Sequence, residues 1–324
     1  MKKYNIAILG ATGLVGRTML KVLEERDFPV KELRLLASER SAGRKLKFKN
    51  EELEVHAVKE NSFEGIDITL FSPGKTASKF WAPVAIKSGC IVIDNSSAWR
   101  MNPEIPLIVP EVNPHVLKNY RGIIANPNCS TIQMVVILNE IKKHFGLRRV
   151  VVSTYQSISG AGQKGIDKLL SELEGNPNND KHKIAFNLMF HDISTFSGHS
   201  EEEIKMINET RKILEMPDLP ISVTCVRLPI LGGHGESLNI QTEKSCSVED
   251  LRNVFSNAKG VVLLDSPLEQ EYPTPAICNG KDECFVGRIR KDDAFENGFY
   301  LWICADNVRK GAATNAVQIA ELFI

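Results

Sequence analysis

Short runs of consecutive apolar residues alternate with amphipathic segments through the first 128 residues. Such runs are typical of buried strands, and apolar residues that recur every three or four positions are typical of helices. The expected strands are Asn5–Gly10, Leu33–Ser38, Leu53–Val58, Ile68–Ser72, Ile91–Asn95 and Ile123–Asn126, and the expected helices are Leu14–Arg26 and Ser78–Ser88. Strands that are apolar on both faces and separated by helices indicate a parallel sheet covered on both sides. We therefore expect a doubly wound α/β domain over residues 1–128.

The pattern changes after residue 129, where strands and helices no longer alternate regularly. The expected strands are Val150–Ser157, Ser222–Leu231, Leu238–Glu243 and Gly260–Leu264, and the expected helices are about 130–143, Gln163–Glu174 and Ala312–Phe323. Ser200 and Glu203 have the spacing of a capping box, which predicts a helix running toward Leu214. The Asn-rich stretch Asn176–Lys183 predicts an exposed loop. We expect a second domain, of α+β type, over residues 129–310.

The length and charge of the chain exclude several classes of protein. A chain of 324 residues agrees with two domains, since a domain has roughly 150 residues. Forty basic residues offset forty acidic ones, so the net charge does not indicate a nucleic-acid partner. The longest apolar stretch, Ile132–Leu138, is far shorter than the roughly 18 residues of a membrane span. Lys2 and Lys3 before Ile6–Leu9 resemble a signal peptide, but glycines interrupt the run and no cleavage site follows, so we expect a cytoplasmic protein.

The seven cysteines include no Cys-x-x-Cys pair and no histidine–cysteine cluster at zinc spacing. Most of the six cysteines other than Cys129 lie within or beside apolar runs. These six are Cys90, Cys225, Cys246, Cys278, Cys284 and Cys304. Such thiols are typically reduced and structural, which fits a reducing compartment. We expect no metal site.

The segment Gly10-Ala11-Thr12-Gly13-Leu14-Val15-Gly16 lies directly between the first expected strand and the first expected helix. Small residues in such a turn let the backbone approach a pyrophosphate, and the helix N-terminus supplies N–H donors and a positive dipole. A tight structural turn is the alternative. The position at the start of a strand–helix–strand pattern favours a Rossmann-type dinucleotide site.

The end of the second expected strand indicates which nicotinamide cofactor binds. NAD sites usually place an acidic residue there, whereas NADP sites place a cation near the 2′-phosphate. Arg40, with Ser38 and Ser41, could hold a 2′-phosphate and favours NADP. Glu39 favours NAD instead, because a shift of one position along the chain would place its carboxylate on the ribose. A solvated loop is the third possibility.

Cys129 lies in the run Asn126-Pro127-Asn128-Cys129-Ser130-Thr131, between an apolar strand and a long helix. Pro127 restricts the preceding residue to extended geometry, so Cys129 falls near the helix start. The N–H groups there favour a thiolate, and together with the Asn128 amide they could stabilise an oxyanion on a carbonyl under attack. A packed structural thiol is more common in general, but the polar surroundings favour a nucleophile here.

A thiol nucleophile needs a partner for proton transfer, and His234 is the best candidate. It follows the expected strand that contains Arg227, and Gly232, Gly233 and Gly235 surround it. We expect these glycines to leave the imidazole accessible. The other histidines are expected on the surface or in loops: His56, His115, His144, His182, His191 and His199.

These segments together resemble the aspartate-β-semialdehyde dehydrogenase family. The similar motifs are the glycine loop at 10–16, Asn95-Ser96-Ser97-Ala98, the run 126–131, Gln156 with Ser159-Gly160-Ala161-Gly162, Arg227 to His234, and Lys310-Gly311-Ala312-Ala313-Thr314-Asn315-Ala316. They occur in order over essentially the whole chain. The combination of the cysteine run with the Arg/His segment is the most specific part.

The resemblance implies a reaction and an organisation. The reaction is the reversible, NADP-dependent conversion of L-aspartyl-4-phosphate to L-aspartate-4-semialdehyde and phosphate, in the pathway to Lys, Met, Thr and Ile. Cys129 would form a thioester that accepts hydride, and His234 would act as general acid/base. The final helix, 311–324, would pack on the cofactor domain, and the domain 129–310 would carry catalysis and dimerisation. A homodimer, or a tetramer, is implied.

The resemblance also implies binding residues. Arg227 would bind the substrate carboxylate, Glu202 the ammonium group and Lys205 the phosphate, although a surface ion pair is the alternative for Glu202 and Lys205. Arg100 would be a second phosphate ligand, and Asn128 and Gln156 would contact substrate beside Cys129. Cofactor contacts would come from Gly10, Thr12, Gly13, Leu14, Val15, Ser38, Arg40, Ser41, Ser72, Ser96, Ser159, Gly160 and Asn315.

Three alternatives remain open. N-acetyl-glutamyl-phosphate reductase shares the thioester chemistry but typically has a Pro-Gly-Cys context. Malonyl-CoA reductase is harder to distinguish from aspartate-β-semialdehyde dehydrogenase by sequence alone. A catalytically silent NADP-binding relative would be expected to lose Cys129 or His234, and both are present.

Overall fold

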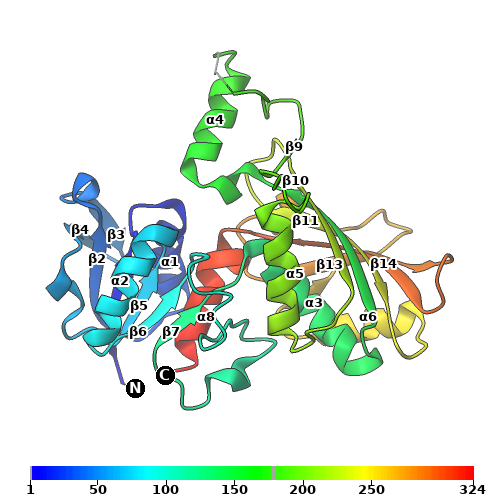
Figure 1. Ribbon diagram of the computed structural model, residues 1–324, viewed down its shortest axis with the longest axis horizontal. Helices are drawn as coiled ribbons and strands as arrows, with labels where there is room; N and C mark the ends of the chain where they lie inside the picture. Colours follow the sequence, from blue (N-terminus) through cyan, green and yellow to red (C-terminus); the bar gives the residue numbers. More distant parts are fainter. Residues whose placement is uncertain (1, 177–179) are drawn as a thin grey trace. The chain divides into compact units, whose positions relative to one another are not determined.

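The computed structural model describes residues 2–176 and 180–324, and the chain forms two compact units (Figure 1). The first unit comprises Met1–Asn128 and Ala312–Ile324, and the second comprises Cys129–Gly311. Part of the expected loop Asn176–Lys183, residues 177–179, lies outside the described residues. Within the described ranges, every helix is too short or too polar to cross a bilayer.

The first unit contains a seven-stranded sheet in the order β3-β4-β2-β1-β5-β6-β7. Its strands are β1 (Tyr4–Leu9), β2 (Val30–Ala37), β3 (Lys45–Phe48), β4 (Glu51–Ala57), β5 (Ile68–Phe71), β6 (Ile91–Asp94) and β7 (Ile123–Ala125), and its helices are α1 (Leu14–Glu25), α2 (Lys75–Lys87) and α8 (Thr314–Glu321). All neighbouring strands are parallel except β3 and β4, so the predicted doubly wound α/β fold is confirmed. The edge strand β3 was not predicted, because its lysines alternate with apolar residues and it has no consecutive apolar run.

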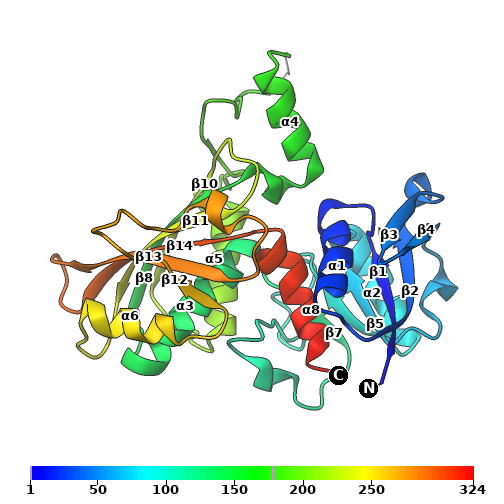
Figure 2. The same cartoon turned by 180° about the vertical axis from the view of Figure 1, so that it is seen from behind.

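Helices cover both faces of this sheet. Ile6 and Ile8 of β1 point to one face, where they belong to an apolar cluster with residues of α1 and α8. Ala7 and Leu9 point to the other face and pack in a second cluster with residues of α2. The two views agree, because α2 lies in front of the strands in Figure 1 and α1 lies in front of them in Figure 2. Burial on both faces explains why these strands are apolar at consecutive positions.

The turn between β1 and α1 lies where the strand order reverses, between β1 and β5. Gly10 has a φ of +89°, and a Cβ there would lie 2.5 Å from the carbonyl oxygen of Ser72. A Cβ on Gly16 would lie 2.2 Å from the carbonyl oxygen of Gly10. Both positions therefore require glycine, since only a bare backbone lets α1 and β5 approach the turn this closely. In open α/β sheets, ligands bind at such a reversal point.

The second unit contains a mixed seven-stranded sheet in the order β12-β13-β14-β11-β8-β10-β9. Its strands are β8 (Arg149–Gln156), β9 (Met189–Phe190), β10 (Ile221–Arg227), β11 (His234–Gln241), β12 (Val261–Leu263), β13 (Cys284–Asp292) and β14 (Gly298–Ala305), and its helices are α3 (Cys129–Phe145), α4 (Gln163–Leu173), α5 (Glu201–Ile213), α6 (Val248–Ser256) and α7 (Pro275–Cys278). Parallel and antiparallel pairs are both present, which confirms the predicted α+β character. Helices α3, α5 and α6 pack against strands of this sheet (Figures 1 and 2).

Several boundaries in this unit differ from the predicted ones. The strand expected over Ser222–Leu231 ends at Arg227, and the next strand begins at His234 rather than at Leu238. Strands β13 and β14 and helix α6 were not predicted. A charged pattern and a bulge between Gly287 and Arg290 obscure β13 in the sequence. The predicted capping box is confirmed, because the Glu203 backbone N–H donates to Ser200 Oγ and the Ser200 backbone N–H donates to the Glu203 carboxylate.

The turn at Gly10 gives a stability prediction with a matched control. Gly10→Ala should lower Tm more than Gly43→Ala, because both positions have positive φ but only Gly10 has backbone atoms within 3 Å of the new Cβ. Backbone strain alone costs about 1–3 kcal/mol, and the Gly10 variant adds a steric conflict with Ser72. Thermal unfolding of the three proteins measures the difference. Equal Tm losses would contradict the close packing of the turn.

Candidate active site

Helix α3 begins at Cys129, so the thiol lies at a helix N-terminus as the sequence predicts. Cys129 is half-buried, and the remainder of α3 is largely buried. The backbone of Gly311 packs on this residue, since a Cβ on Gly311 would lie 2.8 Å from the Cys129 Cβ. The bare backbone of Gly311 therefore leaves room for Cys129 at the helix start, where the helix dipole favours a thiolate.

His234 is the first residue of β11 and is completely buried. The expectation that neighbouring glycines leave the imidazole accessible is wrong. Gly233 packs against the backbone of Pro275, and the ring of Trp302 fills the space beside Gly235. The glycines admit neighbouring groups and do not expose the ring to solvent.

The hydrogen bonds of His234 define its tautomer. The Ser157 backbone N–H donates to His234 Nδ1 at 3.0 Å, so Nδ1 carries a lone pair. Burial, followed by the positive charge of Arg227, lowers the pKa of His234 to about 3. The imidazole is therefore neutral near pH 7, with its proton on Nε2. Within the described residues Nε2 has no hydrogen-bond partner, so this N–H can serve a ligand.

Arg227 ends β10 and lies beside His234 and Cys129. Its Nη1 donates to the Ser157 carbonyl oxygen at 2.7 Å. A Cβ on Gly160 would lie 2.6 Å from Arg227 Nη1 and 3.3 Å from His234 Nε2, so both side chains surround Gly160. Burial lowers the pKa of Arg227, and the negative charge of a Cys129 thiolate is the strongest effect in the opposite direction. The thiol, the guanidinium and the imidazole thus belong to one cluster.

Gln156 lies opposite His234 across the β8–β11 pair. Its Nε2 donates to Ser130 Oγ at 2.6 Å and to Glu202 Oε1 at 3.2 Å. Glu202 has a side chain that is only 12% exposed, so it is not the solvated ion-pair residue of the alternative interpretation. Lys205 Nζ lies 3.8 Å from Glu202 and 3.2 Å from the more exposed Glu201. Helix α5 therefore brings one carboxylate and one ammonium group to the Gln156 end of the cluster.

His191 was expected on the surface or in a loop, and the structure corrects this. Its Nε2 lies 2.8 Å from Gln156 Oε1, which can only accept, so the imidazole donates. Burial first, and then the charge of Arg227, lower the pKa of His191. No local signal distinguishes it from the other loop histidines. Only the folding of residues 180–200 against β10 brings it to Gln156.

Two further predicted residues of the second unit, Ser159 and Gly160, lie in the 3₁₀ turn Ile158–Ala161. The Ser159 hydroxyl accepts from Asn307 Nδ2 at 3.1 Å. Gly160 leaves the space that Arg227 and His234 occupy. Both therefore support the cluster, and their proposed contact with a cofactor stays a prediction.

The candidate substrate residues of the first unit are buried in a network of amides. Arg100 Nε donates to the Asn126 carbonyl oxygen at 2.9 Å, and its Nη2 donates to the Asn95 carbonyl oxygen at 3.0 Å. Asn126 itself donates to the Asn95 side chain. Asn128 is also buried, at 6% exposure. Arg100 therefore holds two loops of this unit in addition to any role toward a phosphate.

Two candidate cofactor residues also have partners within this unit. Asn315 Nδ2 donates to Asn126 Oδ1 at 2.7 Å and to the Ile108 carbonyl oxygen at 3.0 Å. The Ser96 hydroxyl donates to Asp94 Oδ2 at 2.6 Å and accepts from the Ala98 backbone N–H. Their side chains thus stabilise the ends of strands, which is compatible with a supporting role near a cofactor.

The remaining candidate cofactor residues lie at the carboxyl edge of the first sheet. Gly10, Thr12, Gly13, Leu14, Val15 and Ser72 form the β1–α1 turn and the end of β5, and Ser38, Arg40 and Ser41 lie in the 3₁₀ turn after β2. Gly13 is the N-cap of α1, and no side chain of the described residues caps this helix. The first N–H groups of α1 are therefore available to a phosphate, and the turn fits a dinucleotide.

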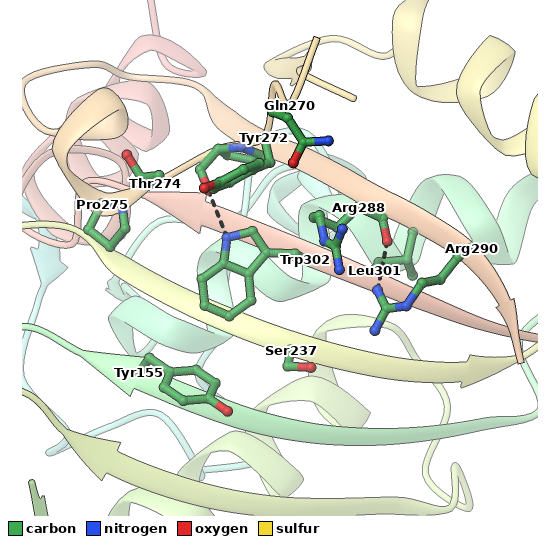
Figure 3. Close-up of a pocket in the computed structure, with 11 residues that line it drawn as sticks. Tyr155, Ser237, Gln270, Tyr272, Thr274, Pro275, Arg288, Arg290, Leu301 and Trp302 are labelled. Carbon is green, nitrogen blue, oxygen red and sulfur yellow. Dashed lines mark hydrogen bonds between the residues drawn. The ribbon is translucent and has the colours of Figure 1, made fainter. Parts of the chain in front are cut away.

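A cavity of about 510 Å³ lies on the opposite face of the second sheet (Figure 3). Tyr155, Ser237 and Trp302 line it, and side chains alternate along strands, so it faces away from Gln156 and His234. The Tyr155 and Trp302 rings are 5.4 Å apart. None of the sequence-predicted site residues lines this cavity. Among the described residues, no cluster of three or more His, Cys, Asp or Glu could hold a metal ion.

Comparisons with known proteins agree with this geometry. Residues 5–120 match the family described as "Semialdehyde dehydrogenase, NAD binding domain", and residues 138–310 match "Semialdehyde dehydrogenase, dimerisation domain". Aspartate-semialdehyde dehydrogenase of Aquifex aeolicus is 57% identical over 333 residues, covering 99% of this chain and 98% of the relative. That of Bacillus subtilis is 50% identical over 334 residues, covering 98% and 96%. A crystal structure of aspartate semialdehyde dehydrogenase II from Vibrio cholerae, complexed with ASA, is 45% identical, covers 100% of this chain and 98% of its own, and has a TM-score of 0.94.

The buried state of His234 predicts how stability depends on pH. The pKa of His234 is about 3 in the folded protein and near 6.5 in the unfolded chain, so the unfolded chain binds the extra proton between these values. The contribution of His234 is complete above about pH 6.5 and is lost as the pH falls toward 3. Urea unfolding between pH 4 and about 7 should show a shallower pH slope for His234→Gln than for the parent protein.

The control is His56→Gln, because His56 is exposed on β4. The free energy of unfolding of His56→Gln should have the same pH slope as that of the parent protein. An identical slope for His234→Gln would contradict the neutral, buried imidazole.

Proposed function

The chain belongs to the aspartate-semialdehyde dehydrogenase family, and we propose that its own residues reduce L-aspartyl-4-phosphate to L-aspartate-4-semialdehyde and phosphate through a thioester on Cys129. It is an oxidoreductase that acts on an aldehyde and has a nicotinamide-binding domain. The family functions in amino-acid biosynthesis. The observation that carries the residue-level proposal is that Arg227 and His234 lie together at Gly160, and that a Cys129 thiolate acts electrostatically on Arg227. These residues combine a nucleophile, a fork for a carboxylate and a hydrogen-bond donor.

The covalent step uses the thiolate of Cys129. The sulfur attacks the acyl-phosphate carbonyl, the carbon–oxygen bond to phosphate breaks, and a thioester and inorganic phosphate result. A thioester accepts hydride where a carboxylate does not, which is the reason for covalent catalysis. A nicotinamide held by the first unit would supply the hydride. Release of the aldehyde restores the thiolate.

His234 acts at the substrate oxygen through Nε2. Because Nδ1 accepts from the Ser157 backbone, Nε2 is the nitrogen that carries the proton in the neutral ring. A hydrogen bond from Nε2 stabilises the oxyanion that forms when sulfur or hydride adds to the carbonyl. This arrangement favours a neutral donor over an imidazolium acid. In the neutral ring Nε2 already carries its proton, so this atom stabilises the substrate oxygen as a hydrogen-bond donor.

The charged side chains correspond to the charged groups of the substrate. Arg227 presents a planar fork to the carboxylate, and Glu202 binds the ammonium group. Lys205 and Arg100 bind the phosphate. Asn128 and Gln156 contact the substrate beside Cys129. The support is chemical complementarity: the second unit contributes a partly buried anion, Glu202, and two partly buried cations, Lys205 and Arg227.

NADP is the proposed cofactor. The Gly10–Gly16 turn and the start of α1 would bind the pyrophosphate, and Arg40 with Ser38 and Ser41 would bind the 2′-phosphate. Glu39 opens the same short turn as Arg40. An NAD preference is therefore the competing outcome of the assay below.

A cytoplasmic homodimer is the proposed assembly. The support is the family description of residues 138–310 as a dimerisation domain and the aromatic face of the second sheet around Tyr155 and Trp302 (Figure 3). Light scattering of the purified protein measures the assembly. A dimer supports the proposal, and a tetramer would extend it.

Cys129→Ala should lower kcat by at least about 10³-fold in phosphate-dependent reduction of NADP by aspartate semialdehyde, because it removes the thiol that forms the proposed thioester. Its affinity for NADPH, followed by fluorescence, should stay close to that of the parent protein. The control is Cys246→Ala, a half-buried thiol outside the cluster, which should keep its activity.

The same assay is run with NAD in parallel and with malonyl-CoA as the alternative substrate. A higher kcat/KM with NADP supports the cofactor assignment. Turnover of malonyl-CoA alone would select a malonyl-CoA reductase, and folded protein that binds NADPH without any turnover would indicate a silent relative.

Gly160→Ala should lower kcat/KM for aspartate semialdehyde by roughly 10- to 100-fold, because the new methyl group displaces the Arg227 guanidinium from His234. Gly160 does not have a positive φ, so alanine introduces no backbone strain there. A Tm close to that of the parent protein would separate misalignment from unfolding. Unchanged kinetics would contradict the proposed site.

A further inference from the structure

Glu236 is a completely buried carboxyl group that the mechanism above does not use. It lies two positions after His234 on β11, so both side chains point to the same face of the sheet. Thr154 of β8 lies opposite Glu236, and Gln156 lies opposite His234. The strands thus place a second polar layer directly beside the candidate catalytic groups.

Helix α3 covers this layer with two polar side chains. Ser130 and Gln133 are both fully buried and lie beside the Glu236 carboxyl group. Gln133 Nε2 donates to the His234 carbonyl oxygen at 3.4 Å. Ser130 Oγ accepts from Gln156 Nε2, and the Ser130 side chain also interacts with the Glu236 carboxyl group.

The hydrogen bonding of the layer is incomplete for an ionised carboxylate. Over residues 2–176 and 180–324, neither oxygen of Glu236 has a partner that meets hydrogen-bond geometry, and the same is true of Gln133 Oε1. Gln133 Oε1 can only accept, and a carboxylate can only accept, so the two acceptors cannot satisfy each other. One proton on Glu236 turns it into a donor and resolves the conflict.

The electrostatics of the layer agree with this geometry. Burial raises the pKa of Glu236 well above its usual value, and the negative charge of Glu202 on α5 adds to the shift. Gln133 and Ser130 act in the opposite direction, with a smaller effect. Cys225 of β10 lies near the same carboxyl group and offers no compensating charge, because a thiol is either neutral or negative; burial raises its pKa.

We propose that Glu236 is a positioning residue, a neutral carboxylic acid that accepts from the Ser130 hydroxyl and donates to Gln133 Oε1. The resulting chain runs from Gln156 through Ser130, Glu236 and Gln133 to the His234 backbone. Because Ser130 follows Cys129 on α3, the chain aligns the nucleophile with the imidazole. This role rests on the proposed function, and the proton on Glu236 does not.

The first test separates the neutral acid from an ionised carboxylate and from mere packing. Glu236→Gln keeps the shape, one acceptor and one donor, whereas Glu236→Leu keeps the volume and removes both. We expect Glu236→Leu to lower kcat by roughly 10- to 100-fold with a small change in KM, since misaligned catalytic groups affect the chemical step. Glu236→Gln should recover most of this loss.

Thr210→Val is the matched control, because Thr210 is a fully buried residue of α5 whose hydroxyl has no partner among the described residues. It should keep kcat near the parent value. The alkylation rate of Cys129 by iodoacetamide should change in Glu236→Leu and not in Thr210→Val. Parent-like kcat in Glu236→Leu, or equal losses in Glu236→Gln and Glu236→Leu, would overturn the positioning role.

The second test is independent of turnover and of the leucine variant. Infrared difference spectra of the parent protein minus Glu236→Gln at pH 7 should contain the C=O stretch of a protonated carboxylic acid. A carboxylate band in its place overturns the proposal even if every kinetic result agrees. Absence of turnover in the parent protein contradicts the proposed function alone, and the infrared band still decides the state of Glu236.

Discussion

One hydrogen bond fixes the chemistry of the site: the Ser157 backbone N–H donates to His234 Nδ1. A backbone donor cannot become an acceptor, so this bond excludes the other neutral tautomer and directs Nε2–H toward the remaining space. Burial also lowers the pKa of His234, which keeps the ring neutral. The position of the donor for a substrate oxygen therefore follows from the course of the main chain after β8.

The surrounding polar groups depend on the same constraint. Arg227 donates to the carbonyl oxygen of Ser157, so one residue orients both the guanidinium and the imidazole. Gly160 provides the space in which the two side chains lie next to each other. In a buried site, each such bond is stronger than it would be in water, and each missing partner is more costly. A cluster of this kind is stable only when nearly all of its members are satisfied, which is why one proton on Glu236 has consequences for the whole layer.

Much of the fold could be predicted from the sequence. Strands buried on both faces, such as β1 and β5, are apolar at consecutive positions and are therefore recognisable. The edge strand β3 and the bulged strand β13 have charged residues on an exposed face, and their pattern resembles that of loops. The start of β11 was misplaced because glycines before a strand have the same appearance as glycines in an open turn.

By itself the sequence determined the family, the two fold classes, the glycine turn before α1 and the placement of Cys129 at a helix start, because each depends on neighbours within about ten positions or on whole motifs. Only the tertiary structure decided that His234 is buried and neutral, that His191 reaches Gln156, and that Glu236 lies against Ser130 and Gln133. These properties come from solvent exclusion and from partners far apart in the chain. No local pattern of residues encodes the electrostatic environment that burial creates.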